Sequence, residues 1–109
     1  MNLTTEHKGD VAIVRVAEAR MLYPILADFA STVTGLVQQG QRKLLIDLTP
    51  VTYVDSATIG CLMDLYRQIS TAGGEVKLSG VQKRVETMLT MTGTQNFIDV
   101  HPDADAALA

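Results

Sequence analysis

The sequence has no tryptophan, a single cysteine and only three prolines among its 109 residues. The lone cysteine, Cys61, cannot form an internal disulfide, which fits a reducing compartment. The two histidines, His7 and His101, lie far apart in the sequence, and no Cys/His cluster is present to hold zinc. We therefore expect a domain that folds without disulfide, metal or cofactor.

Clustered positive charge and long apolar runs are also absent. The formal net charge is −3, and no stretch concentrates Lys and Arg, so we expect no direct binding to nucleic acid. The longest apolar runs, Val11–Val14 and Leu44–Ile46, are far shorter than the roughly 20 residues that cross a bilayer. The polar residues after Met1 do not form a signal peptide. We expect a cytoplasmic protein without membrane insertion.

Apolar periodicity predicts one alternating series of strands and helices. Strands are expected over residues 3–7, 11–16, 44–48, 75–79 and 97–100. Helices are expected over residues 24–40, from about 56 to 72, over 82–91 and over 102–109. Strands separated by such helices imply right-handed crossovers and a mainly parallel sheet, which the first hairpin makes mixed. We expect one α/β domain, residues 1–109, with a mixed central sheet and four flanking helices, and no attached sensor, kinase or DNA-binding domain.

The most informative stretch runs from Val51 to Gly60, where a strand ends and an amphipathic helix begins. Asp55 or Ser56 lies at the helix N-terminus, where four backbone N–H groups lack partners. One interpretation is a helix cap, because Asp and Ser oxygens accept bonds from those groups. The other is that Ser56 receives a phosphoryl group, since a helix N-terminus favours added negative charge. Open α/β sheets also place ligands beyond the carboxyl ends of their strands.

The central part of the chain resembles the STAS domain of bacterial anti-sigma factor antagonists. The resemblance is carried by LLIDLTPVTYVDSATIGCLMDLYRQISTAGGEVKLSGV over residues 44–81, followed by VETMLTMTG over residues 85–93. In that family a strand ends in Asp-Leu, and a spacer with an aromatic leads to Asp-Ser-x-Gly-hydrophobic-Gly at the start of the switch helix. The resemblance implies a STAS-like fold over nearly the whole chain.

The resemblance also implies a non-enzymatic regulator that acts by partner switching. Family members bind an anti-sigma factor, often a serine kinase, and so release a sigma factor. The kinase phosphorylates the Ser after the Asp and dissociates, and a phosphatase reverses the modification. Applied to this sequence, the resemblance implies that the phosphoacceptor is Ser56. We expect a monomer or a weak homodimer. The expected partner-binding residues are Glu18, Arg20, Asp55, Ser56, Ala57, Thr58 and Ile59.

Two positions depart from the family pattern. Thr58 stands where the family usually has Gly, so its side chain would narrow the approach of a kinase or offer a second hydroxyl. Arg20 stands where the family has Asp, two residues after the retained Glu18, and it reverses the charge of a loop that the family uses against its kinase. Both features favour an alternative function. It is a non-phosphorylated interaction subunit of a lipid-transport ABC complex or a signalling assembly.

The remaining candidates are best explained by packing or by surface charge. Met88 and Met91 are expected in the core, because Met fills irregular gaps. Cys61 is expected to be a small buried hydrophobe, since no neighbour in sequence lowers its pKa. Asp64 and Arg67, three apart on one helix, are expected to form a surface ion pair. A small enzyme is disfavoured, because no constellation for acid–base or nucleophilic chemistry is visible.

Overall fold

A computed structural model of the chain describes residues 2–109. Its elements in chain order are β1 (Leu3–Lys8), β2 (Val11–Val16), β3 (Arg20–Met21), the 3₁₀ turn η1 (Tyr23–Ile25), α1 (Leu26–Gln38), β4 (Lys43–Asp47), β5 (Tyr53–Val54), α2 (Ser56–Thr71), β6 (Glu75–Ser79), α3 (Lys83–Thr92), the 3₁₀ turn η2 (Thr94–Asn96), β7 (Asp99–His101) and α4 (Ala104–Leu108). The predicted α/β fold, a mixed sheet with four helices, is confirmed.

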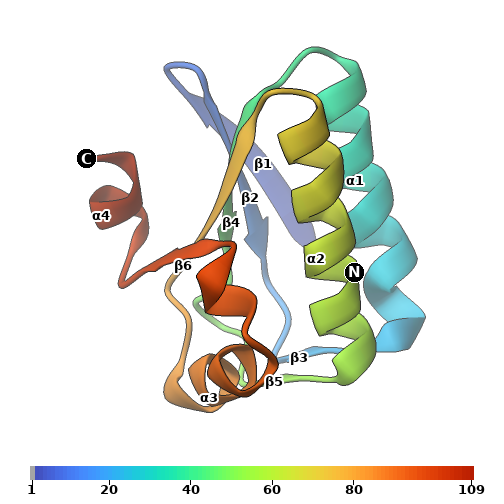
Figure 1. Cartoon of the computed structure of the whole chain (residues 1–109), viewed down its shortest axis with the longest axis vertical. Coiled ribbons are helices and arrows are strands. Elements are labelled where there is room, and N and C mark those ends of the chain that lie inside the picture. The colour runs from blue at the N-terminus through green and yellow to red at the C-terminus, as the bar shows by residue number, and fades with distance from the viewer. Residues whose placement is uncertain (1) are drawn as a thin grey trace.

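The main sheet has five strands in the order β1-β2-β4-β6-β7. The first two strands form the predicted antiparallel hairpin, and each later strand pairs in parallel with its neighbour. A separate two-stranded sheet joins β3 to β5 in parallel. Because parallel strands end at one edge, the segments that follow β2, β4 and β6 gather at that edge, which also holds the start of α2 (Figure 1).

The two faces of the sheet are covered unequally. Helices α1 and α2 lie side by side over one face, and the short α4 lies on the other (Figure 1). The larger core cluster includes Phe29 from α1, Ile46 from β4 and Leu62 from α2, all fully buried. The second face holds a small cluster made of Ile13, Leu45 and Ala107. Since hydrophobic stabilisation scales with buried apolar area, most of it comes from beneath α1 and α2.

The glycine pair after α2 allows the chain to return into β6, as the sequence predicted. Gly73 has a φ of +83°, in the left-handed region that side chains disfavour. A Cβ on Gly74 would lie 2.2 Å from the carbonyl oxygen of Arg42. The first glycine ends the helix and the second lets two backbone segments pass in close contact.

Several predicted element boundaries differ from the structure by one or two residues, and two of them have a clear physical cause. Residues 97–100 were expected to form the last strand, but the N–H groups of Phe97 and Ile98 donate to the Thr94 carbonyl, so β7 begins only at Asp99. The first helix was expected from Pro24, which instead lies in the turn η1, and α1 begins two residues later.

Met91 was expected in the core, and this prediction is wrong. Its side chain is 78% exposed, while Val85 and Leu89 of the same helix are buried. Residues four apart share a helix face, so Val85 and Leu89 point inward together, and Met91, two residues further, points to solvent. Met88 does pack against the core cluster.

The described part of the chain contains neither a membrane-spanning helix nor a cluster of metal ligands. No helix within residues 2–109 combines the length and the apolar character needed to cross a bilayer. Over the same residues, His, Cys, Asp and Glu side chains form no group of three or more suited to a metal ion.

Candidate functional site

Asp55 is the N-cap of α2 and uses both carboxylate oxygens. Oδ1 accepts hydrogen bonds from the backbone N–H and the hydroxyl of Thr58, each at 2.8 Å, and Oδ2 accepts the backbone N–H of Tyr23 at 2.9 Å. The Thr58 hydroxyl also donates to the carbonyl of Met21 at 2.6 Å, so its single proton is shared between two acceptors. The helix-cap interpretation is confirmed, and the same contacts tie the start of α2 to β3 and η1.

These contacts also set the charge of Asp55. Burial by itself raises the pKa of Asp55, but hydrogen bonds from Tyr23 and Thr58 to its carboxylate outweigh this, and the pKa lies below its usual value. Donors aimed at a carboxylate stabilise its charged form. Asp55 is therefore ionised at neutral pH, directly beside Ser56.

Ser56 is the first residue of α2, and its side chain is exposed. Within residues 2–109 its hydroxyl has no hydrogen-bond partner. The backbone N–H groups of Ser56 and Ala57 precede the first intrahelical bonds, while the carboxylate of Asp55 satisfies the N–H of Thr58. A free hydroxyl thus lies next to two unpaired N–H donors at the positive end of a helix.

Thr58 and Ile59 do not form part of this surface. Thr58 is 0% exposed and Ile59 is 5% exposed. The Thr58 hydroxyl is held between Met21 and Asp55, so it is not a second accessible hydroxyl. Both side chains support the site from inside, and the contact of a partner with these two positions stays a prediction.

The other two predicted contact residues are Glu18, just before β3, and Arg20, the first residue of β3. Arg20 is exposed and lies over the ring of Tyr53, with 5.4 Å between the guanidinium carbon and the ring centroid. The β3–β5 pairing places both residues at the same register. Glu18 is half-buried and accepts the backbone N–H of Asn2 at 3.5 Å. The structure thus brings Arg20 to the edge that bears Asp55 and Ser56.

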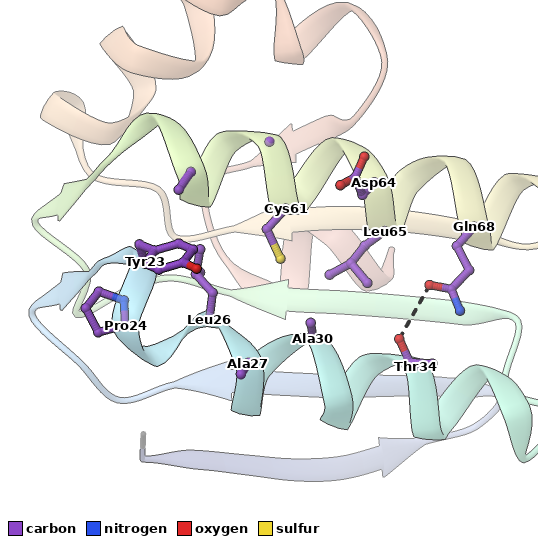
Figure 2. A pocket seen from close by; sticks show the side chains of 12 residues that line it. Tyr23, Pro24, Leu26, Ala27, Ala30, Thr34, Cys61, Asp64, Leu65 and Gln68 are labelled. Atoms are coloured by element: carbon purple, nitrogen blue, oxygen red, sulfur yellow. Dashed lines mark hydrogen bonds between the residues drawn. The ribbon is translucent and has the colours of Figure 1, made fainter.

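A groove between α1 and α2 begins beside Ala57 and has a volume of about 640 Å³. Figure 2 shows the Cys61 thiol and Leu65 of α2 pointing toward α1, with Tyr23 and Pro24 at one end and the Thr34–Gln68 hydrogen bond at the other. Tyr23 is 72% exposed there. The groove therefore offers a largely apolar surface that continues from the start of α2, where Ser56 and Ala57 lie.

Cys61 was expected to be buried, but its side chain is only half-buried, in the wall of this groove. Burial raises the pKa of the Cys61 thiol, and the charge of Asp64 raises it further. The thiol is consequently protonated at neutral pH. Asp64 also pairs with Arg67 at 2.7 Å on the exposed side of α2, which confirms the predicted ion pair.

Comparison with known proteins identifies the family. The profile of the STAS domain matches residues 2–107. This chain belongs to the STAS domain family. The anti-sigma-B factor antagonist of Bacillus subtilis (strain 168) is 27% identical to it over 73 residues, which are 67% of this chain and 66% of that protein. The match thus spans just under two thirds of the relative.

Solved structures show the same fold. An anti-sigma factor antagonist from Mycobacterium paratuberculosis superimposes with a TM-score of 0.88 at 19% identity, covering 98% of this STAS domain and 90% of that chain. The Bacillus cell fate determinant SpoIIAA in its phosphorylated form superimposes with a TM-score of 0.76 at 11% identity, covering 98% and 96%. The predicted STAS fold is confirmed.

Sequence reasoning missed one residue of this STAS domain's candidate surface and one contact. Tyr23 gave no signal, because nothing in the sequence distinguishes an exposed tyrosine from a buried one. The contact between Arg20 and Tyr53 depends on pairing two strands of two residues each, which are too short to show an alternating pattern. Only the register of β3 against β5 reveals it.

Proposed function

We propose that this STAS domain is an anti-sigma factor antagonist that acts by partner switching, with Ser56 as its phosphoacceptor. The proposal is carried by the exposed, unbonded hydroxyl of Ser56 at the first position of α2. The unmodified protein binds an anti-sigma factor of the serine-kinase type and so releases a sigma factor. Phosphorylation ends the binding, and a phosphatase restores it. The anti-sigma-B factor antagonist among its relatives supports this assignment.

The local structure favours a change in binding without a change in fold. A phosphate on Ser56 adds a charge of about −1.5 to −2, and the free N–H groups of Ser56 and Ala57 offset part of its cost. The Asp55 carboxylate is held by Tyr23 and Thr58, so its charge stays beside the phosphate. The added charge and volume therefore act mainly on a docked partner.

The proposed partner surface has three parts. Ser56 and Ala57 form its centre, and the groove that contains Tyr23 extends it along α1 and α2. Its third part is formed by Glu18, just before β3, and by Arg20, the first residue of β3. We assign no catalysis to the chain itself, and we place it in the cytoplasm as a monomer or weak homodimer.

Phosphorylation by the serine-kinase-type anti-sigma factor of the same genome tests the proposal. With ATP, mass spectrometry should locate one phosphate on Ser56 and none in the Ser56→Ala variant. Ser70→Ala is the matched control, because Ser70 is exposed near the far end of the same helix. Phosphorylation of Ser56→Ala to the wild-type level would contradict the assignment.

Binding of the same partner provides a second readout. Ser56→Asp should weaken it in isothermal titration calorimetry and leave the melting temperature nearly unchanged, because an acidic group is favourable at a helix N-terminus. Equal binding by Ser56→Asp and wild type would count against an electrostatic switch.

The alternative is an interaction subunit without a phosphoswitch, in a lipid-transport ABC complex or a signalling assembly. The positive charge of Arg20 still favours it, whereas Thr58 no longer does, because its hydroxyl is buried. Recovery of a transporter ATPase on co-purification, with no kinase-type partner, would select this alternative.

A further inference from the structure

The Lys and Arg side chains differ in what they contact. Of the nine in the sequence, three pair with carboxylates, namely Arg15, Lys43 and Arg67. Two more donate to backbone carbonyls, namely Arg42 and Lys77. Those without a carboxylate or hydrogen-bond partner in residues 2–109 are Lys8, Arg20, Lys83 and Arg84. All but Lys8 lie around one tyrosine, so positive charge is concentrated there on a chain of net charge −3.

Tyr53 is at the centre of this surface. Its ring carries the Arg20 guanidinium on the β3 side, 5.4 Å from the ring centroid. The same residue lines a groove of about 650 Å³ with Lys83, Arg84, Thr87 and Met88 of α3. Elements β3, β5 and α3 lie at one end of the molecule, near the start of α2 (Figure 1). We call Arg20, Tyr53, Lys83 and Arg84 the basic–aromatic patch.

Stability does not explain the cations of α3. Lys83 and Arg84 occupy its first two positions, where positive charge opposes the helix dipole. The N-cap residue, Gln82, gives no side-chain cap and instead donates its amide to the Thr49 carbonyl. No carboxylate in residues 2–109 pairs with either cation. Their charge is therefore available to an anionic group outside the chain.

We propose that the basic–aromatic patch docks an acidic segment of the protein partner. The proposal rests on the proposed function, since the patch reaches to within two residues of the cap Asp55, at the start of α2. Carboxylates form charge-assisted hydrogen bonds with Arg and Lys. Tyr53 and Met88 add apolar contact area along the same groove. A short peptide rich in Asp and Glu matches both features.

The size and surroundings of the patch argue against larger polyanions. Three cations are fewer than the roughly 6–10 phosphate contacts that strong DNA binders make, and fewer than the clusters of about 4–8 that recognise anionic lipids. Residues 86–109 hold four acidic side chains and no basic one, so the part of the chain after Arg84 adds no cation to the patch. A short acidic segment matches a patch of three cations.

The charge of Arg20 gives the patch a role in partner choice. Charges across an interface act mainly on specificity and association rate. A partner whose facing segment is basic would meet like charge at Arg20. The basic–aromatic patch therefore selects a partner whose facing segment is acidic.

Lys83→Glu tests the proposal, with Lys8→Glu as matched control. Both replace an unpaired lysine and change the net charge equally, and Lys8 lies at the β1–β2 turn, at the opposite edge of the sheet. The first probe is a synthetic octapeptide of glutamate, with an octapeptide of glutamine as neutral reference. Nuclear magnetic resonance spectra of ¹⁵N-labelled protein locate the binding site at low salt.

The glutamate peptide should shift the amide signals of Arg20, Tyr53 and the first turn of α3, and the glutamine peptide should not. Lys83→Glu should weaken binding about tenfold, and Lys8→Glu less than about twofold. Shifts elsewhere, or equal weakening by both variants, would overturn the proposal. Tighter binding at the patch by single-stranded DNA, or by vesicles containing phosphatidylglycerol, would overturn it in favour of that anion.

Binding of the kinase-type partner to the same variants separates the docking proposal from the proposed function. Weaker partner binding by Lys83→Glu than by Lys8→Glu supports the patch. If Ser56→Asp weakens partner binding while Lys83→Glu and Lys8→Glu bind equally, the docking proposal fails and the proposed function stands. If no kinase-type partner binds the wild type but the peptide result holds, the proposed function fails and the patch remains an acidic-peptide site.

Discussion

Replacing Asp55 with Asn tests whether this residue does more than cap a helix. Asn and Asp are about equally good N-caps, so the replacement would cost little if capping were the only role. In the structure, however, Oδ1 accepts from Thr58 and Oδ2 accepts from the backbone N–H of Tyr23. Asn has one acceptor oxygen and one donor NH₂ group. One of the two contacts must then place a donor against a donor.

The magnitude follows from the contact that is lost. A hydrogen bond to a charged group contributes about 1.5–3 kcal/mol, and the exposed setting of the Tyr23 contact places it near the lower end. We expect Asp55→Asn to lower the free energy of unfolding by about 1–2 kcal/mol. For a domain of roughly 100 residues, each kcal/mol lowers Tm by about 4–8 °C.

Urea unfolding followed by circular dichroism at pH 7 measures this loss. The control is Asp103→Asn, because Asp103 caps α4 and, among residues 2–109, its side chain accepts only the N–H of Ala106, at 2.8 Å. This variant should lie within about 0.5 kcal/mol of wild type. An equally small effect at Asp55 would show that the contact with Tyr23 contributes nothing.

The effect of Asp55 should also depend on pH. Its pKa is lowered in the folded state, so its stabilisation is complete above the unfolded value of about 3.9. The stabilisation is lost as the pH falls through the folded value. The difference between wild type and Asp55→Asn should therefore narrow as the pH falls below about 3.9. A difference that widens in acid would contradict the assigned charge state.

Two further predictions concern the groove and the turn after α2. Because burial raises the pKa of Cys61, iodoacetamide should alkylate it more slowly in the native protein than in urea, and equal rates would count against this. Gly74→Ala should destabilise the fold by about 1–3 kcal/mol in urea titrations, since its Cβ would lie 2.2 Å from the Arg42 carbonyl oxygen. The control is Gly60→Ala, which has open space at its Cβ and should be neutral or stabilising. A Gly74→Ala variant as stable as the wild type would refute the close contact with Arg42.

Periodicity and turn residues were enough to predict the main architecture. The β-branched run of β2, the apolar run of β4 and the helical stripe of α2 each carry a strong local signal, and each lies where expected. The cap role of Asp55 also follows from local preference. Its bond to Tyr23 does not, because it joins residues 32 apart through a turn whose path depends on the fold.

The basic–aromatic patch was beyond sequence reasoning for a similar reason. Arg20, Tyr53 and Lys83 come from three separate parts of the chain, and no local stretch is rich in positive charge. They meet because β3 pairs with β5 and because α3 lies against Tyr53. For Met91 the sequence suggested a contact that the structure lacks. Met91 was expected in the core because it is apolar and close to buried residues of the same helix, but its side chain points to solvent.

The strand order of the sheet bears on how the protein is made. Because β1, β2, β4, β6 and β7 lie in the order in which they leave the ribosome, no strand must be inserted between two that have already paired. Within residues 2–109, every hydrogen bond to the Asp55 side chain is donated by Tyr23 or Thr58. The turn that presents Ser56 can therefore be completed before α3 emerges. The basic–aromatic patch is assembled only after Arg84 has been added.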